Sequence, residues 1–86
     1  MYEKTITISN ETGLHARPAA EFVNFVKGIE GKVSLIKDNK TVNAKSILNV
    51  LSLALKKGSE CVVRVEGENA EEAAEKIVDF VSNLAD

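Results

Sequence analysis

The stretch Gly13-Leu14-His15-Ala16-Arg17-Pro18-Ala19 marks the point where the chain changes from a strand pattern to a helix pattern. Before it, residues 2–8 alternate apolar and polar side chains, which is typical of a strand with one open face. After it, apolar residues recur at helical spacing as far as Ile29. Proline lacks an N–H and fixes φ near a helical value, so it is tolerated in the first turn of a helix and poorly placed in its interior. We therefore predict that His15 lies at the entrance of a helix that begins at Ala16.

The middle of the chain predicts a hairpin followed by a short helix. Two short strand-like runs, 32–36 and 40–43, flank Asp38-Asn39, whose residue types tolerate the positive φ of a tight turn. Ser46 is a favoured N-cap residue and predicts a helix that runs to about Leu53.

The last third predicts a strand and a long helix. Residues 60–66 alternate again, and Asn69 with Glu72 resembles a capping box in front of an amphipathic helix that reaches about Leu84. The predicted order is βαββαβα. Because helices can cover one face of the sheet while polar side chains mark the other, the fold class is a two-layer α+β domain, and residues 1–86 form a single domain.

His15 and Arg17 have the chemistry that phosphoryl transfer needs. A helix start leaves backbone N–H groups without partners and carries partial positive charge, which stabilises a bound anion by roughly 0.3–1 kcal/mol. With His15 as the N-cap, the nearest free amides are those of Ala16 and Arg17, because Pro18 has none. The guanidinium of Arg17 can donate two hydrogen bonds to phosphate oxygens, and a neutral imidazole is a nucleophile. His15 could therefore accept a phosphoryl group.

The plain alternative is that these residues only begin a helix. A single histidine at this position can be a surface cap, and Arg17 can pair with Glu21 one turn further along, a contact worth about 0.3–0.5 kcal/mol. The residues around His15, taken alone, leave both interpretations open.

The same seven residues resemble the active-site signature of the HPr family, the histidine-containing phosphocarriers of the phosphoenolpyruvate-dependent sugar phosphotransferase system. Residues 42–53 resemble the regulatory serine region of that family, and the likeness runs from the first strand to the last helix. The resemblance implies an open-faced β-sandwich, in which three helices cover one face of a four-stranded antiparallel sheet of strand order 1-4-2-3. It also implies that the δ nitrogen of His15 takes phosphate from phosphorylated enzyme I and passes it to a histidine of a sugar-specific IIA domain.

Ser46 has a regulatory meaning only through this resemblance. In the family, the matching serine is phosphorylated by an ATP-dependent HPr kinase/phosphorylase. That modification weakens phosphate acceptance at the histidine and promotes binding to a catabolite-control repressor, which links the protein to transcription regulation. From the residues alone, Ser46 is a good N-cap, and a phosphate there would meet the free amides of its helix.

A partner surface is expected on the first two helices. Residues 47–55 hold six large apolar side chains, more than one face of a short helix can point inward, so some of them should be exposed: Ile47, Leu48, Val50, Leu51, Leu53 and Leu55. The docking positions of the family map onto Ala20, Asn24, Lys27, Ile47, Leu48 and Leu51. The chain departs from the common family pattern at Asn49, where many members have glycine. It departs again at Leu48 and Leu51, where many have methionine, a side chain that adapts to several partners.

Composition excludes several other classes of protein. With 11 Lys and Arg against 13 Asp and Glu, the net charge of −2 gives no basic excess for nucleic acid. The most apolar stretch, residues 47–55, is far shorter than the ~20 residues that span a membrane, and no leader pattern opens the chain. The single cysteine, Cys61, fits a reduced cytoplasmic setting and a place in the core. The chain shows no glycine-rich nucleotide loop and no set of metal ligands, so we expect a carrier without cofactor or metal, not an autonomous enzyme.

Other functions remain as alternatives. One is a regulatory adaptor of the HPr type, whose output is binding that depends on Ser46; the nucleophile at His15 argues against it. Another is a phosphocarrier of the nitrogen-related branch of the same system. The segment Lys45-Ser46-Ile47 favours the sugar branch over this alternative. A metal-binding domain is poorly supported by one histidine and one cysteine. For the phosphocarrier we expect a monomer.

Overall fold

The computed structural model describes residues 1–11 and 13–84 and confirms the predicted order of elements. The elements are β1 (Tyr2–Thr7), α1 (Ala16–Lys27), β2 (Lys32–Lys37), β3 (Lys40–Asn43), α2 (Ile47–Ser52), β4 (Glu60–Glu66) and α3 (Ala70–Ser82). The strands form one antiparallel sheet in the order β1-β4-β2-β3, as the resemblance implies.

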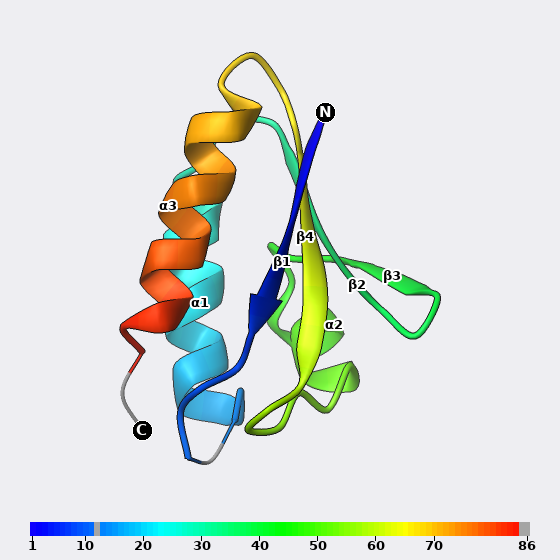
Figure 1. Ribbon diagram of the computed structural model, residues 1–86, viewed down its shortest axis with the longest axis vertical. Helices are drawn as coiled ribbons and strands as arrows, with labels where there is room; N and C mark the ends of the chain where they lie inside the picture. Colours follow the sequence, from blue (N-terminus) through cyan, green and yellow to red (C-terminus); the bar gives the residue numbers. More distant parts are fainter. Residues whose placement is uncertain (12, 85–86) are drawn as a thin grey trace.

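The helices lie on one side of this sheet. Figure 1 shows α1 and α3 side by side against it, and α2 packs against α1 and β3. Phe22 of α1 and Ile77 of α3 are fully buried against Leu35 of the sheet. On the open face, Arg64 of β4 donates to the carboxylate of Glu3 on β1 at 2.6 Å, and the two residues are cross-strand partners. The two-layer α+β prediction is therefore confirmed.

The β2–β3 turn has the backbone that its residues predict. Asp38 and Asn39 both have positive φ, 50° and 67°, the signature of a two-residue hairpin turn whose twist matches the flanking strands. This turn sets the register in which Leu35 faces Val42, so that Leu35 is buried in the core.

All three helices start where the sequence predicts, but the capping box expected at the third is not formed. His15 and Ser46 are the N-caps of α1 and α2, and the Ser46 hydroxyl accepts a hydrogen bond from the amide of Asn49 at 3.5 Å. Asn69 is the N-cap of α3, but its side chain caps no amide, so the predicted capping box is wrong. The reason is local: Asn69 has ψ near 41°, outside the extended region from which a capping side chain reaches the amides of the first turn.

Ala54 is strained, and glycine should relieve the strain. It has φ of 51°, a left-handed conformation in which the Cβ of an L-residue lies too close to its own backbone, at a cost of about 1–2 kcal/mol. Glycine avoids that cost but loses more chain entropy on folding, about 0.5–1 kcal/mol. We expect Ala54→Gly to raise the free energy of unfolding by about 0.5–1 kcal/mol, measured by urea denaturation.

The matched control is Ala73→Gly, at a half-buried position inside α3. There the backbone is helical, so only the entropic cost of glycine remains and the variant should lose about 1 kcal/mol. Equal losses in both variants would show that Ala54 carries no strain.

Candidate functional site

His15 lies at the surface and starts α1. Its backbone is extended, with φ of −82° and ψ of −170°, and its carbonyl accepts the first helical hydrogen bond, from the amide of Ala19 at 2.9 Å. The imidazole makes no capping hydrogen bond and is exposed to solvent. His15 is thus placed as predicted, with a ring that a partner protein can reach.

The first turn of α1 offers two donors beside His15. Among the described residues, no acceptor is found for the backbone amides of Ala16 and Arg17. The next residue, Pro18, has no N–H, and its ring is buried in the core. Both free amides therefore belong to the exposed end of the helix, where the helix dipole favours an anion.

The Arg17 side chain is exposed and available to such an anion. The alternative in which it pairs with Glu21 is not formed: within residues 1–11 and 13–84, no ion pair joins the two side chains. An unpaired guanidinium next to two free amides can donate to several oxygens of one phosphoryl group at once.

Ser46 lies on the adjacent helix, and its neighbour Lys45 ties that helix to α1. The Nζ of Lys45 donates to the carbonyls of Ile29 at 2.7 Å and Gly31 at 2.9 Å, in the turn that follows α1. This contact was not predicted, because no local pattern distinguishes a lysine that reaches backbone carbonyls from one that points into solvent.

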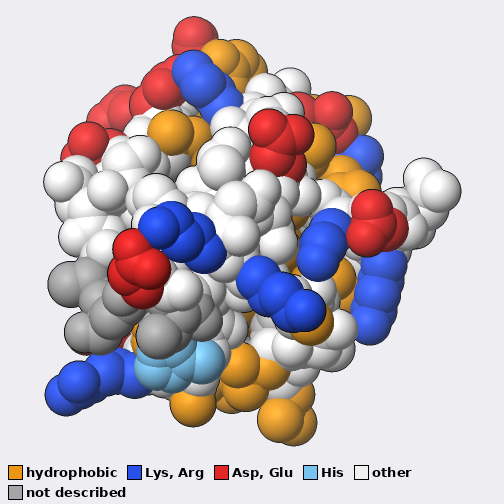
Figure 2. Space-filling model, turned by 60° about the horizontal axis from the view of Figure 1, so that its bottom comes forward, with side chains coloured by type: hydrophobic (Ala, Val, Ile, Leu, Met, Phe, Trp, Pro, Cys, Tyr) orange, Lys and Arg blue, Asp and Glu red, His pale blue; other side chains and the backbone are white. Residues whose placement is uncertain are grey.

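The α2 segment divides its apolar residues between core and surface, as predicted. Val50, Leu53 and Leu55 are buried, whereas Leu48 is 77% exposed and Ile47 is 36% exposed. In Figure 2 the histidine lies at the surface, with hydrophobic side chains beside it and Lys and Arg side chains nearby.

The predicted docking positions come from two helices in contact, α1 and α2. Asn24, Lys27 and Leu48 are exposed, and Ala20 and Leu51 are half-buried. Together with Ile47 these residues are accessible, and we call them the docking patch: Ala20, Asn24, Lys27, Ile47, Leu48 and Leu51.

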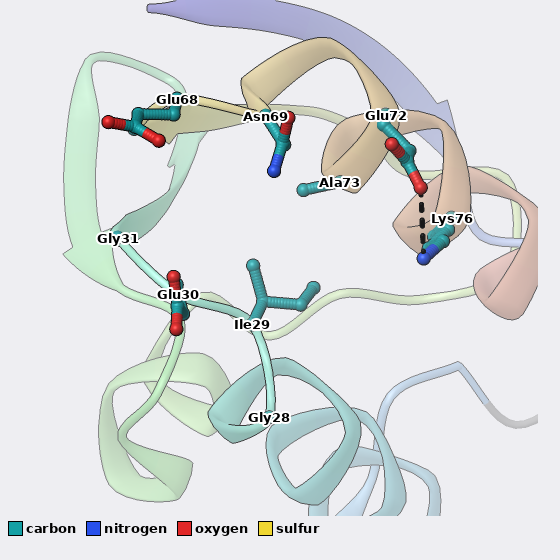
Figure 3. Close-up of a pocket in the computed structure, with 10 residues that line it drawn as sticks. Gly28, Ile29, Glu30, Gly31, Glu68, Asn69, Glu72, Ala73 and Lys76 are labelled. Carbon is teal, nitrogen blue, oxygen red and sulfur yellow. Dashed lines mark ion pairs between the residues drawn. The ribbon is translucent and has the colours of Figure 1, made fainter.

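One hollow of the structure lies away from His15. A cavity of about 440 Å³ opens between the end of α1 and the start of α3 (Figure 3). Its lining includes Gly28, Ile29, Glu68, Asn69 and the ion-paired Glu72–Lys76. Because α1 is 12 residues long, about 18 Å separates this end of the helix from His15. No predicted site residue lines this cavity, whereas a second hollow of about 540 Å³, between α1 and the end of α3, is lined in part by Asn24.

Asn10 and Leu55 form hydrogen bonds with the peptide that precedes His15, and neither residue was predicted from the sequence. Asn10 is buried, and its Nδ2 donates to the carbonyl of Gly13 at 2.6 Å. The carbonyl of Leu55 accepts from the amide of Leu14 at 2.9 Å. The glycine at position 13 was a usable signal for a close approach of two backbone segments, but the sequence does not reveal the second segment.

Residues 2–83 match the family described as "PTS HPr component phosphorylation site". The chain belongs to the HPr family. It is 38% identical over 84 residues to the phosphocarrier protein HPr of Vibrio cholerae, covering 98% of this chain and 99% of that one. It is 42% identical over 81 residues to the HPr-like protein Crh of Bacillus subtilis, covering 94% and 95%.

Solved structures agree with the fold. A crystal structure of an HPr from Thermoanaerobacter tengcongensis matches with a TM-score of 0.90 and 45% identity, covering 95% of this chain and 92% of that one. An HPr dimer from the same organism matches with a TM-score of 0.70 and 43% identity, covering 95% and 94%. The family places this chain among the phosphocarriers of the phosphotransferase system and confirms the open-faced sandwich.

The described residues contain no helix that is long and apolar enough to cross a membrane. Cys61 is buried in β4, and burial raises the pKa of its thiol to about 11. At neutral pH this thiol stays protonated and inert.

Proposed function

We propose that this HPr-family chain relays a phosphoryl group from phosphorylated enzyme I, through His15, to sugar-specific IIA domains. The observation that carries the proposal is the exposed imidazole of His15 at the start of α1, next to the two free amides of Ala16 and Arg17. The chain acts as a carrier: the partner proteins bring the reacting phosphate and take it away.

The transfer is a displacement at phosphorus. The lone pair of a neutral His15 nitrogen, the δ nitrogen by the family resemblance, attacks the phosphorus held by enzyme I. The new P–N bond forms as the bond to the donor breaks, and the donor keeps that electron pair. The amides of Ala16 and Arg17 and the Arg17 guanidinium then bind the phosphoryl oxygens. In the second transfer the histidine of the IIA domain is the nucleophile and His15 is the leaving group.

The direct test is incubation of the chain with enzyme I and phosphoenolpyruvate, with phosphate incorporation measured by mass. The product should be labile in acid and stable in alkali, as a P–N bond is and a serine ester is not. Absence of phosphate on the wild-type chain, under conditions in which enzyme I itself is phosphorylated, would refute the proposal.

The docking patch supports the same role. Its exposed Leu48 and Ile47 form an apolar contact area, and Lys27 adds positive charge at its edge. Enzyme I, IIA domains and HPr kinase/phosphorylase would each bind this patch in turn, on a cytoplasmic monomer. Leucine at positions 48 and 51, in place of the more adaptable methionine, favours a narrower set of partners.

Ser46 supports regulation of the same surface. Its hydroxyl caps α2 and its residue is half-buried next to exposed Ile47. A phosphate added there would keep the cap and place about −1.5 to −2 charges beside the docking patch. Phosphorylation by HPr kinase/phosphorylase would then oppose docking of enzyme I and create a surface for a catabolite-control repressor.

The Ser46→Asp variant should accept phosphate from enzyme I more slowly than wild type, with the larger part of the effect in KM. The carboxylate can still cap α2, so the free energy of unfolding should not fall. Rates are compared at low and high salt, because the penalty on docking is electrostatic and salt screens it. Ser46→Ala is the uncharged control. If Ser46→Asp accepts phosphate at the wild-type rate at low salt, Ser46 serves only as a helix cap.

A second candidate function has one observation in its favour. HPr-like proteins named Crh are as similar to this chain as HPr proteins are, at 41% and 42% identity. A regulatory adaptor would bind its repressor after phosphorylation of Ser46 without taking phosphate from enzyme I. The exposed His15 favours the phosphocarrier, and the incubation with enzyme I separates the two functions.

A further inference from the structure

The peptide unit between Gly13 and Leu14 is held at both ends. Its carbonyl accepts from the Nδ2 of Asn10 at 2.6 Å, and its N–H donates to the carbonyl of Leu55 at 2.9 Å. Asn10, Leu14 and Leu55 are all buried. A peptide plane with both polar groups bonded in a buried setting has one orientation, because turning it would leave a donor and an acceptor without partners.

The partner segment is itself fixed. Residues 53–59, between α2 and β4, are also bonded to Ile8: the amide of Ile8 donates to Ser59 at 2.9 Å, and the amide of Gly58 donates to Ile8 at 2.7 Å. Left-handed Ala54 turns the chain just before Leu55. The amide of Ala54 donates to the carbonyl of Leu51 at 3.1 Å, so the segment that presents the Leu55 carbonyl is hydrogen-bonded both before and after Leu55.

Gly13 makes this close approach possible. It has φ of 70°, and a Cβ added there would collide with the carbonyl oxygen of Leu55 and lie 2.7 Å from the Cα of Lys56. Both contacts are with backbone, which cannot rotate away. Any side chain at position 13 must therefore push the two segments apart and break the Leu14–Leu55 hydrogen bond.

We propose that this doubly anchored peptide positions His15 for phosphoryl transfer, with Asn10 and Gly13 as positioning residues. The peptide fixes the backbone that immediately precedes His15. The buried Leu14 side chain prevents this backbone from rotating. The direction of the imidazole relative to the free amides of α1 follows from that backbone. The inference rests on the proposed function, because it concerns the rate of transfer through His15.

Three glycines of the chain allow a matched test. Gly13, Gly31 and Gly58 all have positive φ, so alanine is strained at each of them. At Gly58 an added Cβ meets nothing within 4 Å, whereas at Gly31 it collides with the carbonyl of Glu66 at the other end of the molecule. Gly58→Ala therefore controls for left-handed strain, and Gly31→Ala controls for a backbone collision.

The measurement is phosphate transfer from phosphorylated enzyme I, with kcat and KM determined separately for the folded fraction of each variant. Gly13→Ala should lose about tenfold to hundredfold in kcat with little change in KM, because misplacement of a reacting group by about 1 Å costs that much. Gly31→Ala should be destabilised as much or more and keep the wild-type kcat. Gly58→Ala should keep the wild-type kcat as well, because alanine retains the backbone amide that donates to Ile8 and its Cβ meets nothing within 4 Å.

Asn10→Ala provides a second arm if Gly13→Ala does not fold. It removes the donor to the Gly13 carbonyl, and it should also lower kcat; Ser34→Ala, at a buried polar side chain in β2, is its control. Wild-type kcat in Gly13→Ala, or in Asn10→Ala where the first variant is unfolded, overturns the inference while the proposed function stands. An equal loss of kcat in Gly31→Ala overturns it as well, since the effect would be general. If wild type itself accepts no phosphate from enzyme I, both proposals fall.

Discussion

The His15→Ala variant is expected to accept no phosphate from enzyme I and phosphoenolpyruvate, and to fold as wild type does. The loss should be complete because the other groups near the start of α1, the amides of Ala16 and Arg17 and the Arg17 guanidinium, bind oxygen but cannot attack phosphorus. The fold should survive because the His15 ring is exposed and makes no capping bond. Phosphate incorporation is followed by mass, and folding by thermal denaturation.

The control is His15→Asn. Asparagine is a favoured N-cap that is not a nucleophile in this chemistry, so this variant should be at least as stable as wild type and equally unable to accept phosphate. Phosphate on either variant, in a form labile to acid, would place the acceptor at another residue and contradict the assignment of His15.

The order of elements was predictable because the periodic patterns are long enough to be read from one sequence. The two faces of β4 alternate over seven residues, and the apolar stripe of α1 repeats over more than three turns. Asp38 and Asn39 fixed the hairpin turn through their tolerance of positive φ. The strand order came from the resemblance to HPr, because nothing in the local pattern states which strands are neighbours.

The placement of the candidate site residues was predictable where it depends on local sequence. His15, Ala16, Arg17 and Pro18 are consecutive, and the roles of the free amides follow from where the helix begins. The hydrogen bond between the amide of Leu14 and the carbonyl of Leu55 was not predictable. Leu55 lies about forty residues further along the chain, and its contribution is a backbone carbonyl, which every residue has. For the same reason the hydrogen bonds from Lys45 to the backbone carbonyls after α1 could not be predicted from the sequence.

Asn69 shows how a local signal can mislead. The residue types at positions 69 and 72 match a capping box, yet Glu72 pairs with Lys76 one turn along α3 and the Asn69 side chain faces the cavity at the end of α1 (Figure 3). A capping box requires an extended N-cap backbone, which residue type alone does not guarantee.

The Arg17→Ala variant is expected to transfer phosphate about 10²–10³ times more slowly than wild type, the range for removal of one donor to a developing negative charge. Its stability should barely change, because the side chain is exposed and forms no ion pair with the described residues. Kinetics with phosphorylated enzyme I, at several salt concentrations, measure the first effect, and urea denaturation measures the second.

Two further variants test whether Arg17 binds the phosphoryl group directly or only contributes positive charge that attracts enzyme I. Lys56→Ala removes the same charge from the exposed segment that follows Leu55, so an effect on the approach of enzyme I alone would appear in both variants and be screened by salt. Arg17→Lys restores the charge but not the planar pair of donors, so it should recover only part of the rate. If Arg17→Ala and Lys56→Ala slow transfer equally, and salt removes both effects, Arg17 does not bind the phosphoryl group. If Arg17→Ala alone is slow at every salt concentration, its guanidinium contacts the phosphoryl oxygens during transfer, next to the amides that start α1.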